Sequence, residues 1–335
     1  MRQLDIKKKY LITGSAGFIG FHLAARLLEK GARVVGLDNL NDYYEVSLKE
    51  DRLRLLEKYG NHSFIKGDLA DKEGVLALFE RERPEVVVNL AAQAGVRYSI
   101  DNPDAYIQSN LVGFFHILEA CRRYPAEHLV FASSSSVYGG NEKVPFATDD
   151  PVDRPVSLYA ATKKSNELMA YSYSKLYGIP ATGLRFFTVY GPYGRPDMAC
   201  CKFARKIMSG EPVQIYNNGD MYRDFTYIDD IIQGVENVLC NPPAPDSLGA
   251  RCRVYNIGNS RPEKLMDFVT ILEKYLGREA RKEFLPMQPG DVYQTYADVS
   301  DLVRDFGFRP ATSLDEGMKR FVGWFKEYYG YEETV

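Results

Sequence analysis

The sequence predicts an α/β fold, with a doubly wound parallel sheet in the first part of the chain and a smaller α/β domain after it. Strand-like and helix-like patterns alternate with short connections up to about residue 188. Some strand-like runs are continuously apolar, as in EVVVNLAA (85–92), which is typical of parallel strands buried on both faces. A glycine-rich stretch joins the first strand to the first helix.

The individual elements follow from local signals. The run KYLIT (9–13) reads as a strand, and the helical apolar spacing after it ends at Gly31, a natural helix stop. A second amphipathic pattern also ends at a glycine, Gly60. The expected strands are 9–13, 33–38, 63–68, 85–92, 127–134 and 181–187. The expected helices are 18–31, 47–60, 71–83, about 104–124 and 157–178.

The bulk composition excludes several classes of protein. The chain has 335 residues, 45% of them hydrophobic, and a net charge of −3, so it lacks the basic excess of a nucleic-acid-binding protein. It has no apolar run long enough to span a bilayer and no secretory leader pattern. Its five cysteines show no metal-ligand spacing and read as free thiols. We therefore expect a cytoplasmic protein with no metal site, no membrane partner and no nucleic-acid partner.

The stretch TGSAGFIG indicates a dinucleotide site. It spaces Gly14, Gly17 and Gly20 as G-x-x-G-x-x-G between a strand and a helix, the context that this pattern needs. Glycines there let the backbone approach a pyrophosphate, and the helix N-terminus offers it N–H groups.

The end of the second strand favours NAD over NADP as the cofactor. Asp38 lies 18 residues after Gly20, where a carboxylate accepts hydrogen bonds from the adenosine ribose and repels a 2′-phosphate. Arg33 begins that strand and is poorly placed to hold a phosphate. Asp68 ends the third strand and is expected to face the adenine, and the small residues of NLAAQAG (89–95) suit close passage of a cofactor.

These patterns divide the chain into two functional parts. Residues 1–187 are predicted to form an NAD-binding Rossmann domain, to which later segments, about 222–258, return. Residues 188–335, where the alternation loosens and Gly and Pro increase, should mainly form the substrate-binding domain. The substrate would then lie in the crevice at the carboxyl ends of the strands.

A catalytic base is predicted on the helix that follows the fifth strand. Tyr159 and Lys163 are spaced i and i+4, so they share one helix face. A tyrosine is a poor base at neutral pH, but a nearby ammonium favours the phenolate and lowers the pKa. The fifth strand runs into SSSSVYGG, and a hydroxyl there could relay a substrate proton to Tyr159. Ser134 is the best candidate, while some of its neighbours are expected to cap turns.

At this point the sequence resembles the extended short-chain dehydrogenase/reductase family and, within its NAD-dependent epimerases and dehydratases, most closely the UDP-glucuronate 4-epimerases. The likeness rests on the glycine pattern, on Ser134, Tyr159 and Lys163, and on several longer stretches. These are DNLNDYY (38–44), LAAQAGVRYS (90–99), ASSSSVYG (132–139), SLYAATKKSNELMA (157–170), GLRFFTVYGPYGRPDMA (183–199), RDFTYIDDI (223–231) and LPMQPGDVYQTYAD (285–298).

The resemblance implies a mechanism and a cofactor. Tyr159, helped by Ser134, would take the proton of the sugar 4-hydroxyl, and the C4 hydride would pass to tightly bound NAD+. The 4-keto sugar would turn over and take the hydride back on its other face, converting UDP-glucuronate into UDP-galacturonate. The predicted cofactor contacts are Gly14, Gly17, Phe18, Ile19, Gly20, Asp38, Asn39, Asp68, Leu69, Leu90, Ala91, Ala92, Gln93, Asn110, Ser133, Tyr159 and Lys163.

The serine run also bears on what happens to the carboxylate. Oxidation at C4 of a glucuronate gives a β-keto acid that loses CO2 readily. Related decarboxylases and dehydratases have an acidic residue in this segment, whereas this chain has none from Ser133 to Gly140. Hydroxyls instead suit an anionic oxygen, so Ser134, Ser135 and Thr188 are expected to hold the carboxylate.

Further substrate contacts come from the second part of the chain. Arg195 could recognise the acid or the ribose, or form a structural ion pair, and Tyr216 could lie against the uracil. Arg223 resembles the diphosphate-binding arginine of the family. The predicted substrate contacts are Ser134, Ser135, Tyr159, Thr188, Arg195, Lys202, Tyr216, Arg223 and Asp291.

Three alternatives to this function stay open, together with one expectation about assembly. The chain could be a UDP-glucose/UDP-galactose 4-epimerase, a UDP-glucuronate decarboxylase, or an NAD-binding regulatory module without catalysis. The family resemblance also implies a homodimer that forms through a four-helix bundle of the segments near 104–124 and 157–177.

Overall fold

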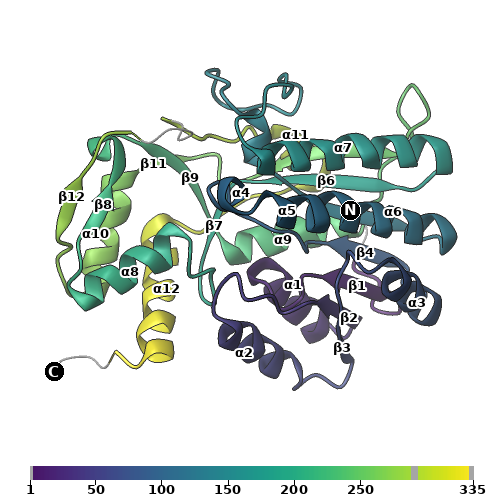
Figure 1. Ribbon diagram of the computed structural model, residues 1–335, viewed down its shortest axis with the longest axis horizontal. Coiled ribbons are helices and arrows are strands. Elements are labelled where there is room, and N and C mark those ends of the chain that lie inside the picture. Colours follow the sequence, from purple (N-terminus) through teal and green to yellow (C-terminus); the bar gives the residue numbers. More distant parts are fainter. Residues whose placement is uncertain (1–2, 288–292, 332–335) are drawn as a thin grey trace.

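The centre of the molecule is a seven-stranded parallel sheet. The computed structural model of the protein describes residues 3–287 and 293–331 (Figure 1). The strand order is β10-β6-β5-β4-β1-β2-β3. These strands are β1 (Lys9–Thr13), β2 (Arg33–Asp38), β3 (His62–Lys66), β4 (Val86–Asn89), β5 (His128–Ser134), β6 (Ala181–Phe186) and β10 (Cys252–Ile257). The order reverses direction between β1 and β4, which is where a doubly wound sheet opens a crevice for a ligand.

Helices cover both faces of this sheet. Successive strand residues point to opposite sides, so Leu11 packs into one apolar cluster while Tyr10 and Ile12 pack into the other. The cluster around Leu11 includes α3 (Lys72–Glu82), α6 (Gly113–Arg123) and α7 (Leu158–Tyr177). The opposite cluster includes α1 (Phe18–Glu29), the end of α2 (Val46–Leu56) and α9 (Ile228–Leu239). The predicted doubly wound α/β class is therefore confirmed.

One helix departs from its prediction. The segment expected to be a regular helix over about 104–124 consists of α5 (Pro103–Tyr106), a π-helix η1 (Ile107–Val112) and α6, preceded by a short α4 (Tyr98–Asp101). The wider turn of η1 holds Asn110, whose side-chain amide exchanges hydrogen bonds of 2.8 and 3.0 Å with the backbone of Gln93. A π-turn of this kind is common where a helix serves a functional site.

The second part of the chain forms a smaller lobe beside the carboxyl ends of the strands (Figure 1). It holds two small sheets, β11-β9-β7 and β12-β8. Its strands are β7 (Thr188–Tyr190), β8 (Val213–Ile215), β9 (Tyr222–Tyr227), β11 (Pro262–Lys264) and β12 (Lys282–Phe284). Its helices are α8 (Ala199–Ser209), η3 (Tyr216–Gly219), α10 (Leu265–Leu276) and α12 (Leu314–Tyr329), whereas α11 (Ser300–Phe306) packs against β10 of the main sheet and against α9. By contrast, β10 pairs with β6 in the main sheet although it lies late in the sequence.

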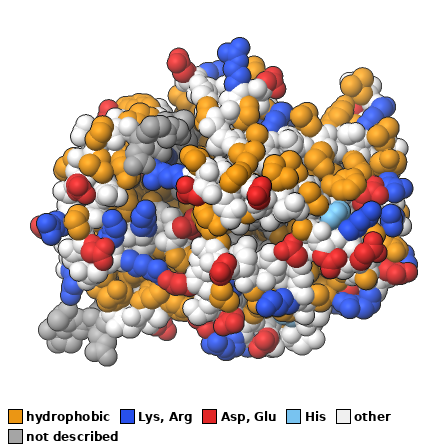
Figure 2. All heavy atoms as spheres, in the orientation of Figure 1, with side chains coloured by type: hydrophobic (Ala, Val, Ile, Leu, Met, Phe, Trp, Pro, Cys, Tyr) orange, Lys and Arg blue, Asp and Glu red, His pale blue; other side chains and the backbone are white. Residues whose placement is uncertain are grey.

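The surface carries mixed charge. Figure 2 shows blue and red side chains interspersed over the face in view, with apolar side chains gathered on the right, where Figure 1 places α6 and α7. Exposed apolar residues of this region include Phe115, Leu168, Leu176 and Tyr177. Within residues 3–287 and 293–331, no helix has the length and hydropathy needed to cross a bilayer.

Candidate active site

A cavity of about 870 Å³ lies at the carboxyl ends of the strands, between the main sheet and the smaller lobe. Both predicted sets of binding residues meet there. The predicted residues that line it are Gly14, Gly17, Phe18, Ile19, Gly20, Asp38, Asn39, Asp68, Leu69, Leu90, Ala91, Ala92, Gln93, Ser133, Ser134, Ser135, Tyr159, Lys163, Thr188, Arg195, Lys202 and Arg223. The structure thus brings together residues that lie more than 200 positions apart in the sequence.

The glycine-rich turn between β1 and α1 leaves no room for side chains. Gly14 has φ +72°, and a Cβ on it would lie 2.8 Å from the backbone nitrogen of Ala91. A Cβ on Gly20 would lie 2.1 Å from the carbonyl oxygen of Gly14. The turn therefore packs backbone against backbone, and the first turn of α1 opens onto the cavity with its N–H groups. This arrangement can receive the phosphates of a dinucleotide.

The acidic residues at the ends of β2 and β3 are held in place by backbone groups. Asp38 is buried and accepts hydrogen bonds from the N–H groups of Ala16 (3.2 Å) and Leu40 (2.9 Å). Asp68 accepts a 2.9 Å hydrogen bond from Asn39. The two carboxylates therefore line the same end of the cavity, where they can accept hydrogen bonds from an adenosine.

Tyr159 lies in the first turn of α7. That turn begins at Ser157, whose side chain accepts a 3.1 Å hydrogen bond from the N–H of Ala160. Burial raises the pKa of the Tyr159 phenol, and a hydrogen bond with Ser134 and the positive charge of Arg195 both oppose this rise. Tyr159 and Ser134 are therefore arranged to share a proton.

Lys163 follows Tyr159 one helical turn later and is buried. Its Nζ donates a 2.9 Å hydrogen bond to the carbonyl of Ala132 and lies 5.9 Å from the centre of the Tyr159 ring. Burial lowers the pKa of Lys163 to about 8. Ser134 and Arg195 are the groups that oppose the rise in the pKa of Tyr159, so a lowering of that pKa by Lys163 stays a prediction.

The serine run turns sharply at the end of β5. Ser134 caps the short 3₁₀ helix η2 (Ser135–Tyr138). The Oγ of Ser134 accepts a 3.1 Å hydrogen bond from the N–H of Ser136 and donates a 3.1 Å hydrogen bond to the Oγ of Ser136. Ser135 and Ser136 line the cavity, whereas Ser133 donates its hydroxyl away from it, to Glu167. The run thus combines turn capping with a hydroxyl-lined floor.

Arg195 lies on the opposite side, in the loop between β7 and α8. Its Nε donates a 3.0 Å hydrogen bond to Asp197, which also accepts one of 3.2 Å from the hydroxyl of Tyr43. Tyr43 belongs to the segment after β2, so this contact bridges the two lobes across the cavity. The expected alternative for Arg195, a loop-fixing ion pair, is thus present, and Arg195 also lines the cavity.

Three predicted contacts do not line this cavity or lie outside the described residues. Asn110 does not line the cavity; it is buried behind the wall and fixes the backbone of Gln93. Tyr216 lines an adjoining cavity of about 230 Å³, to which Thr188 and Arg223 also contribute. Asp291 lies outside the described residues.

The sequence prediction missed several residues of the site. Tyr43, Asp197, Glu167 and Arg185 were not selected, although each had a local signal. Tyr43 follows the cofactor-binding Asp38 closely, and Asp197 stands two residues after Arg195. Arg185 is the one charged residue of an otherwise apolar predicted strand, ATGLRFF, which indicates a buried ion pair.

The family model for GDP-mannose 4,6 dehydratase matches residues 11–321. Protein CapI of Staphylococcus aureus is 54% identical over 96% of this chain and 99% of its own length. A probable UDP-glucuronate 4-epimerase of Rhizobium meliloti is 48% identical over 98% of this chain and 99% of its own. The crystal structure of UDP-glucuronic acid 4-epimerase from Bacillus cereus, in complex with UDP-glucuronic acid and NAD, superposes with a TM-score of 0.87 and 35% identity, covering 96% of this chain and all of that one.

Proposed function

We propose a function for this chain on the basis that it belongs to the GDP-mannose 4,6-dehydratase family of nucleotide-sugar epimerases and dehydratases. It is an NAD-dependent UDP-glucuronate 4-epimerase, an isomerase that interconverts UDP-glucuronate and UDP-galacturonate. The observation that carries the proposal is the meeting of Ser134, Tyr159 and Lys163 with the glycine-rich turn in one cavity. A proton-transfer pair and a dinucleotide site side by side suit reversible oxidation of an alcohol.

The residues present fit NAD. The glycine turn would meet the pyrophosphate with backbone N–H groups, and Asp38 would accept hydrogen bonds from the adenosine ribose. The buried carboxylate of Asp38 disfavours a 2′-phosphate, which supports NAD rather than NADP. Lys163 lies where its ammonium can hold the nicotinamide ribose. Bound NAD+ would supply reversible hydride chemistry at the C4 carbon of the sugar.

The chain itself moves the proton. Tyr159 as phenolate would accept the proton of the sugar 4-hydroxyl, and Ser134, which lines the same cavity, would donate a hydrogen bond to the same sugar oxygen. The positive charge of Arg195 favours that phenolate. When the 4-keto sugar has turned over, Tyr159 returns the proton to the oxygen, so the alcohol forms with inverted configuration and no net oxidation.

The floor of the cavity supports retention of the carboxylate. Between Ser133 and Gly140 the sequence has no acidic residue that could act as a general acid or base at C5 and C6, which disfavours 4,6-dehydration. Ser134, Ser135 and Thr188 offer neutral hydroxyl donors, and Arg195 offers a charge-assisted pair. Held between them, the carboxylate is kept from aligning its C–C bond with the ketone.

The adjoining cavity supports a uridine diphosphate. Its volume of about 230 Å³ and its largely apolar wall suit a flat base, which Tyr216 would contact. Arg223 lines both cavities, and Lys202 lines the larger one, so both can reach a diphosphate that runs between them. Asp291 remains a predicted contact.

The decisive test is a product analysis. The purified protein is incubated with UDP-glucuronate, and the products are followed by NMR together with CO2 release. UDP-galacturonate without CO2 is the expected result. UDP-xylose with CO2 would identify a decarboxylase, and conversion of UDP-glucose with no reaction of UDP-glucuronate would identify a UDP-glucose/UDP-galactose 4-epimerase. Bound NAD with no turnover of either sugar would identify a non-catalytic NAD-binding module.

We further propose a cytoplasmic homodimer. Leu168 (60% exposed), Leu176 (67%) and Phe115 (37%) leave an apolar surface on the neighbouring helices α6 and α7. Pairing of these helices with those of a second copy would bury it as a four-helix bundle. Light scattering should give twice the mass of 38.0 kDa, and Leu168→Glu with Leu176→Glu should give the monomer mass. A wild-type protein that stays monomeric at high concentration contradicts the proposal.

A further inference from the structure

Helix α7 is fastened to the end of β5 at three consecutive strand residues. The carbonyl of Ala132 accepts from Lys163 over 2.9 Å, and the hydroxyl of Ser133 donates to Glu167 over 2.6 Å. Ser134 lines the cavity together with Tyr159, and its hydroxyl opposes the rise in the pKa of Tyr159. The three helix residues follow one another at four-residue intervals and so lie on one face of α7. The contact between Ser134 and Tyr159 is therefore one of three, and the other two lie deeper in the protein.

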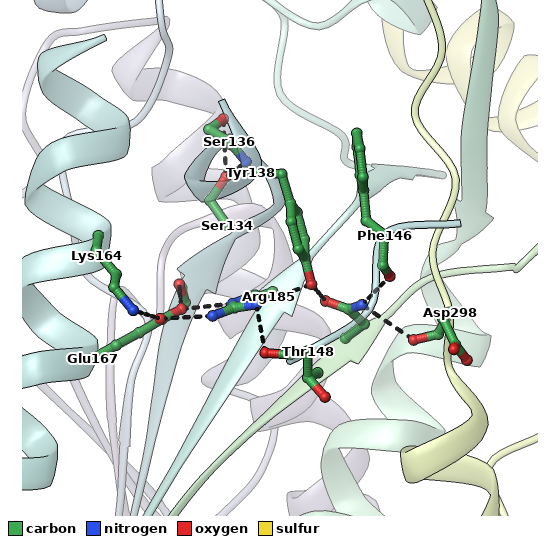
Figure 3. A network of polar contacts seen from close by, with 11 residues as sticks. Ser134, Ser136, Tyr138, Phe146, Thr148, Lys164, Glu167, Arg185 and Asp298 are labelled. Carbon is green, nitrogen blue, oxygen red and sulfur yellow. Dashed lines mark hydrogen bonds and ion pairs between the residues drawn. The ribbon is translucent and has the colours of Figure 1, made fainter. Parts of the chain in front are cut away.

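Glu167 is in turn held by Arg185 on the neighbouring strand. Ser133 of β5 and Arg185 of β6 are register partners, and both reach the same carboxylate. Arg185 donates from Nε and Nη2 to the two oxygens of Glu167 over 2.8 and 2.9 Å. This bidentate geometry fixes the orientation of the carboxylate as well as its position (Figure 3).

The same guanidinium holds the far end of the serine run. Arg185 Nη1 donates a 3.0 Å hydrogen bond to the hydroxyl of Tyr138, the last residue of η2, and that hydroxyl donates over 2.6 Å to Asn256. Figure 3 shows Arg185 between Glu167 and Tyr138, with Ser134 and Ser136 on the turn that connects the two anchored ends. One arginine thus fixes both ends of the 133–138 segment.

Stability alone is a weak reason for this arrangement. Glu167 and Arg185 are 4% and 3% exposed, and an apolar pair of similar volume is often as stable as a buried ion pair. Each partner favours the charged form of the other, so the pKa of Glu167 is lowered and that of Arg185 is raised. The pair is ionised and rigid, which suits a role in positioning.

We infer that Glu167 and Arg185 are positioning residues that hold the hydroxyl of Ser134 against the phenol of Tyr159. They touch neither substrate nor cofactor and act through Ser133 and the turn that follows it. The role in epimerisation rests on the proposed function. The positioning of the hydroxyl of Ser134 against Tyr159 does not rest on the proposed function, because the pKa of Tyr159 can be measured in the protein without substrate.

The smallest informative change is Ser133→Ala, which removes one hydroxyl and leaves the Glu167–Arg185 ion pair in place. We expect kcat to fall about 10- to 100-fold with a much smaller change in KM, because the reacting groups are misplaced while the substrate contacts remain. The acid limb of the pH–rate profile should move to higher pH, because a looser hydrogen bond from Ser134 stabilises the phenolate less.

Ser174→Ala is the matched control. Ser174 is also on α7 and fully buried, and its Oγ accepts one hydrogen bond, from the N–H of Arg251. It should lower the melting temperature about as much as Ser133→Ala and leave kcat and the pH profile unchanged. Equal kinetic losses in both variants, or a wild-type profile in Ser133→Ala, would overturn the inference.

A second variant separates position from stability. The double change Glu167→Leu with Arg185→Met replaces the ion pair by apolar side chains and should fold with a melting temperature near that of the wild type. It should nevertheless show the same fall in kcat and the same shift of the acid limb. A stable double variant with wild-type kcat would mean that the pair is not needed for positioning.

A titration without substrate distinguishes failure of this inference from failure of the proposed function. The ultraviolet absorbance of tyrosinate is followed against pH, and the Tyr159→Phe curve is subtracted to isolate Tyr159. Ser133→Ala should raise the pKa of Tyr159, and Ser174→Ala should not. This outcome supports the inference whichever nucleotide sugar the protein uses, and an unchanged pKa in Ser133→Ala contradicts it.

Discussion

The floor of the cavity, formed by residues 133–138 and helix α7, is built from buried polar groups, whereas the ion pair at its rim is more accessible, with the side chains of Arg195 and Asp197 22% and 32% exposed. On the floor, Ser133, Glu167 and Arg185 are 3–5% exposed and joined by hydrogen bonds of 2.6 to 2.9 Å. On the rim, Asp197 is exposed and pairs with Arg195 in a loop.

This difference indicates a division of labour. Proton transfer depends on atomic positions, and buried, fully bonded groups hold positions well. Recognition of a substrate anion requires a cation whose partner can be exchanged, and an exposed loop permits that exchange. Substitutions in the floor should therefore act mainly on kcat, and substitutions in the rim mainly on KM.

Tyr159→Phe is expected to have the largest effect. It removes the proton acceptor and leaves the ring in place, so kcat should fall about 10²- to 10⁴-fold with little change in substrate affinity. Tyr171→Phe is the matched control, because Tyr171 lies on the same helix and its hydroxyl binds only the surface residue Asp246 among the described residues. If Tyr159→Phe turned over at nearly the wild-type rate, Tyr159 would not be the group that accepts the substrate proton.

Arg195→Gln tests the rim. Loss of a charged hydrogen-bond donor should raise the KM for UDP-glucuronate about 10- to 100-fold, while a UDP-hexose without a carboxylate is bound as before. Because the same charge favours the phenolate of Tyr159, the acid limb of the pH–rate profile should also move to higher pH. Initial rates against substrate concentration give the two parameters. Arg320→Gln, at an arginine paired on the surface with Glu316, should change neither. A fall in kcat at constant KM would assign Arg195 to the floor instead.

The pH dependence of kcat should distinguish Lys163 from its neighbour Lys164. The pKa of Lys163 is lowered to about 8, so its ammonium is present below that pH and lost above it. kcat should therefore fall as the pH rises through about 8. Lys163→Arg keeps its charge at all working pH values and should flatten this alkaline limb, even at a lower maximal rate. Lys164→Arg should keep the wild-type profile, and an unchanged limb in Lys163→Arg would contradict the assignment.

Asp197→Asn is expected to have the smallest effect. Asp197 competes with the substrate for Arg195, so its neutralisation should lower the KM for UDP-glucuronate, by less than about fivefold because exposed ion pairs are weak. Affinity by calorimetry should change in the same direction. An increase in KM would show that Asp197 orients Arg195 rather than competing for it.

The predicted residues that the structure brings together in one cavity share a local signal. The glycine turn, Asp38 and the Tyr159–Lys163 pair were identified because their spacing along one strand, turn or helix fixes their relative position. Asn110 was predicted to contact the cofactor, although it supports the cavity wall from behind, and the sequence did not show that Tyr216 lines a separate, adjoining cavity. Both positions depend on how separate elements pack, which no spacing encodes.

The sequence was enough to predict the alternation of strands and helices, the glycine-rich turn and the shared helix face of Tyr159 and Lys163, because these follow from periodicity and from steric limits within a few residues. The contacts that hold the serine run in place became visible in the folded structure alone. Ser133 meets Glu167 across 34 residues and Tyr138 meets Asn256 across 118. Such contacts arise from the packing of strands and helices against one another, since a parallel sheet brings the carboxyl ends of distant strands to one edge.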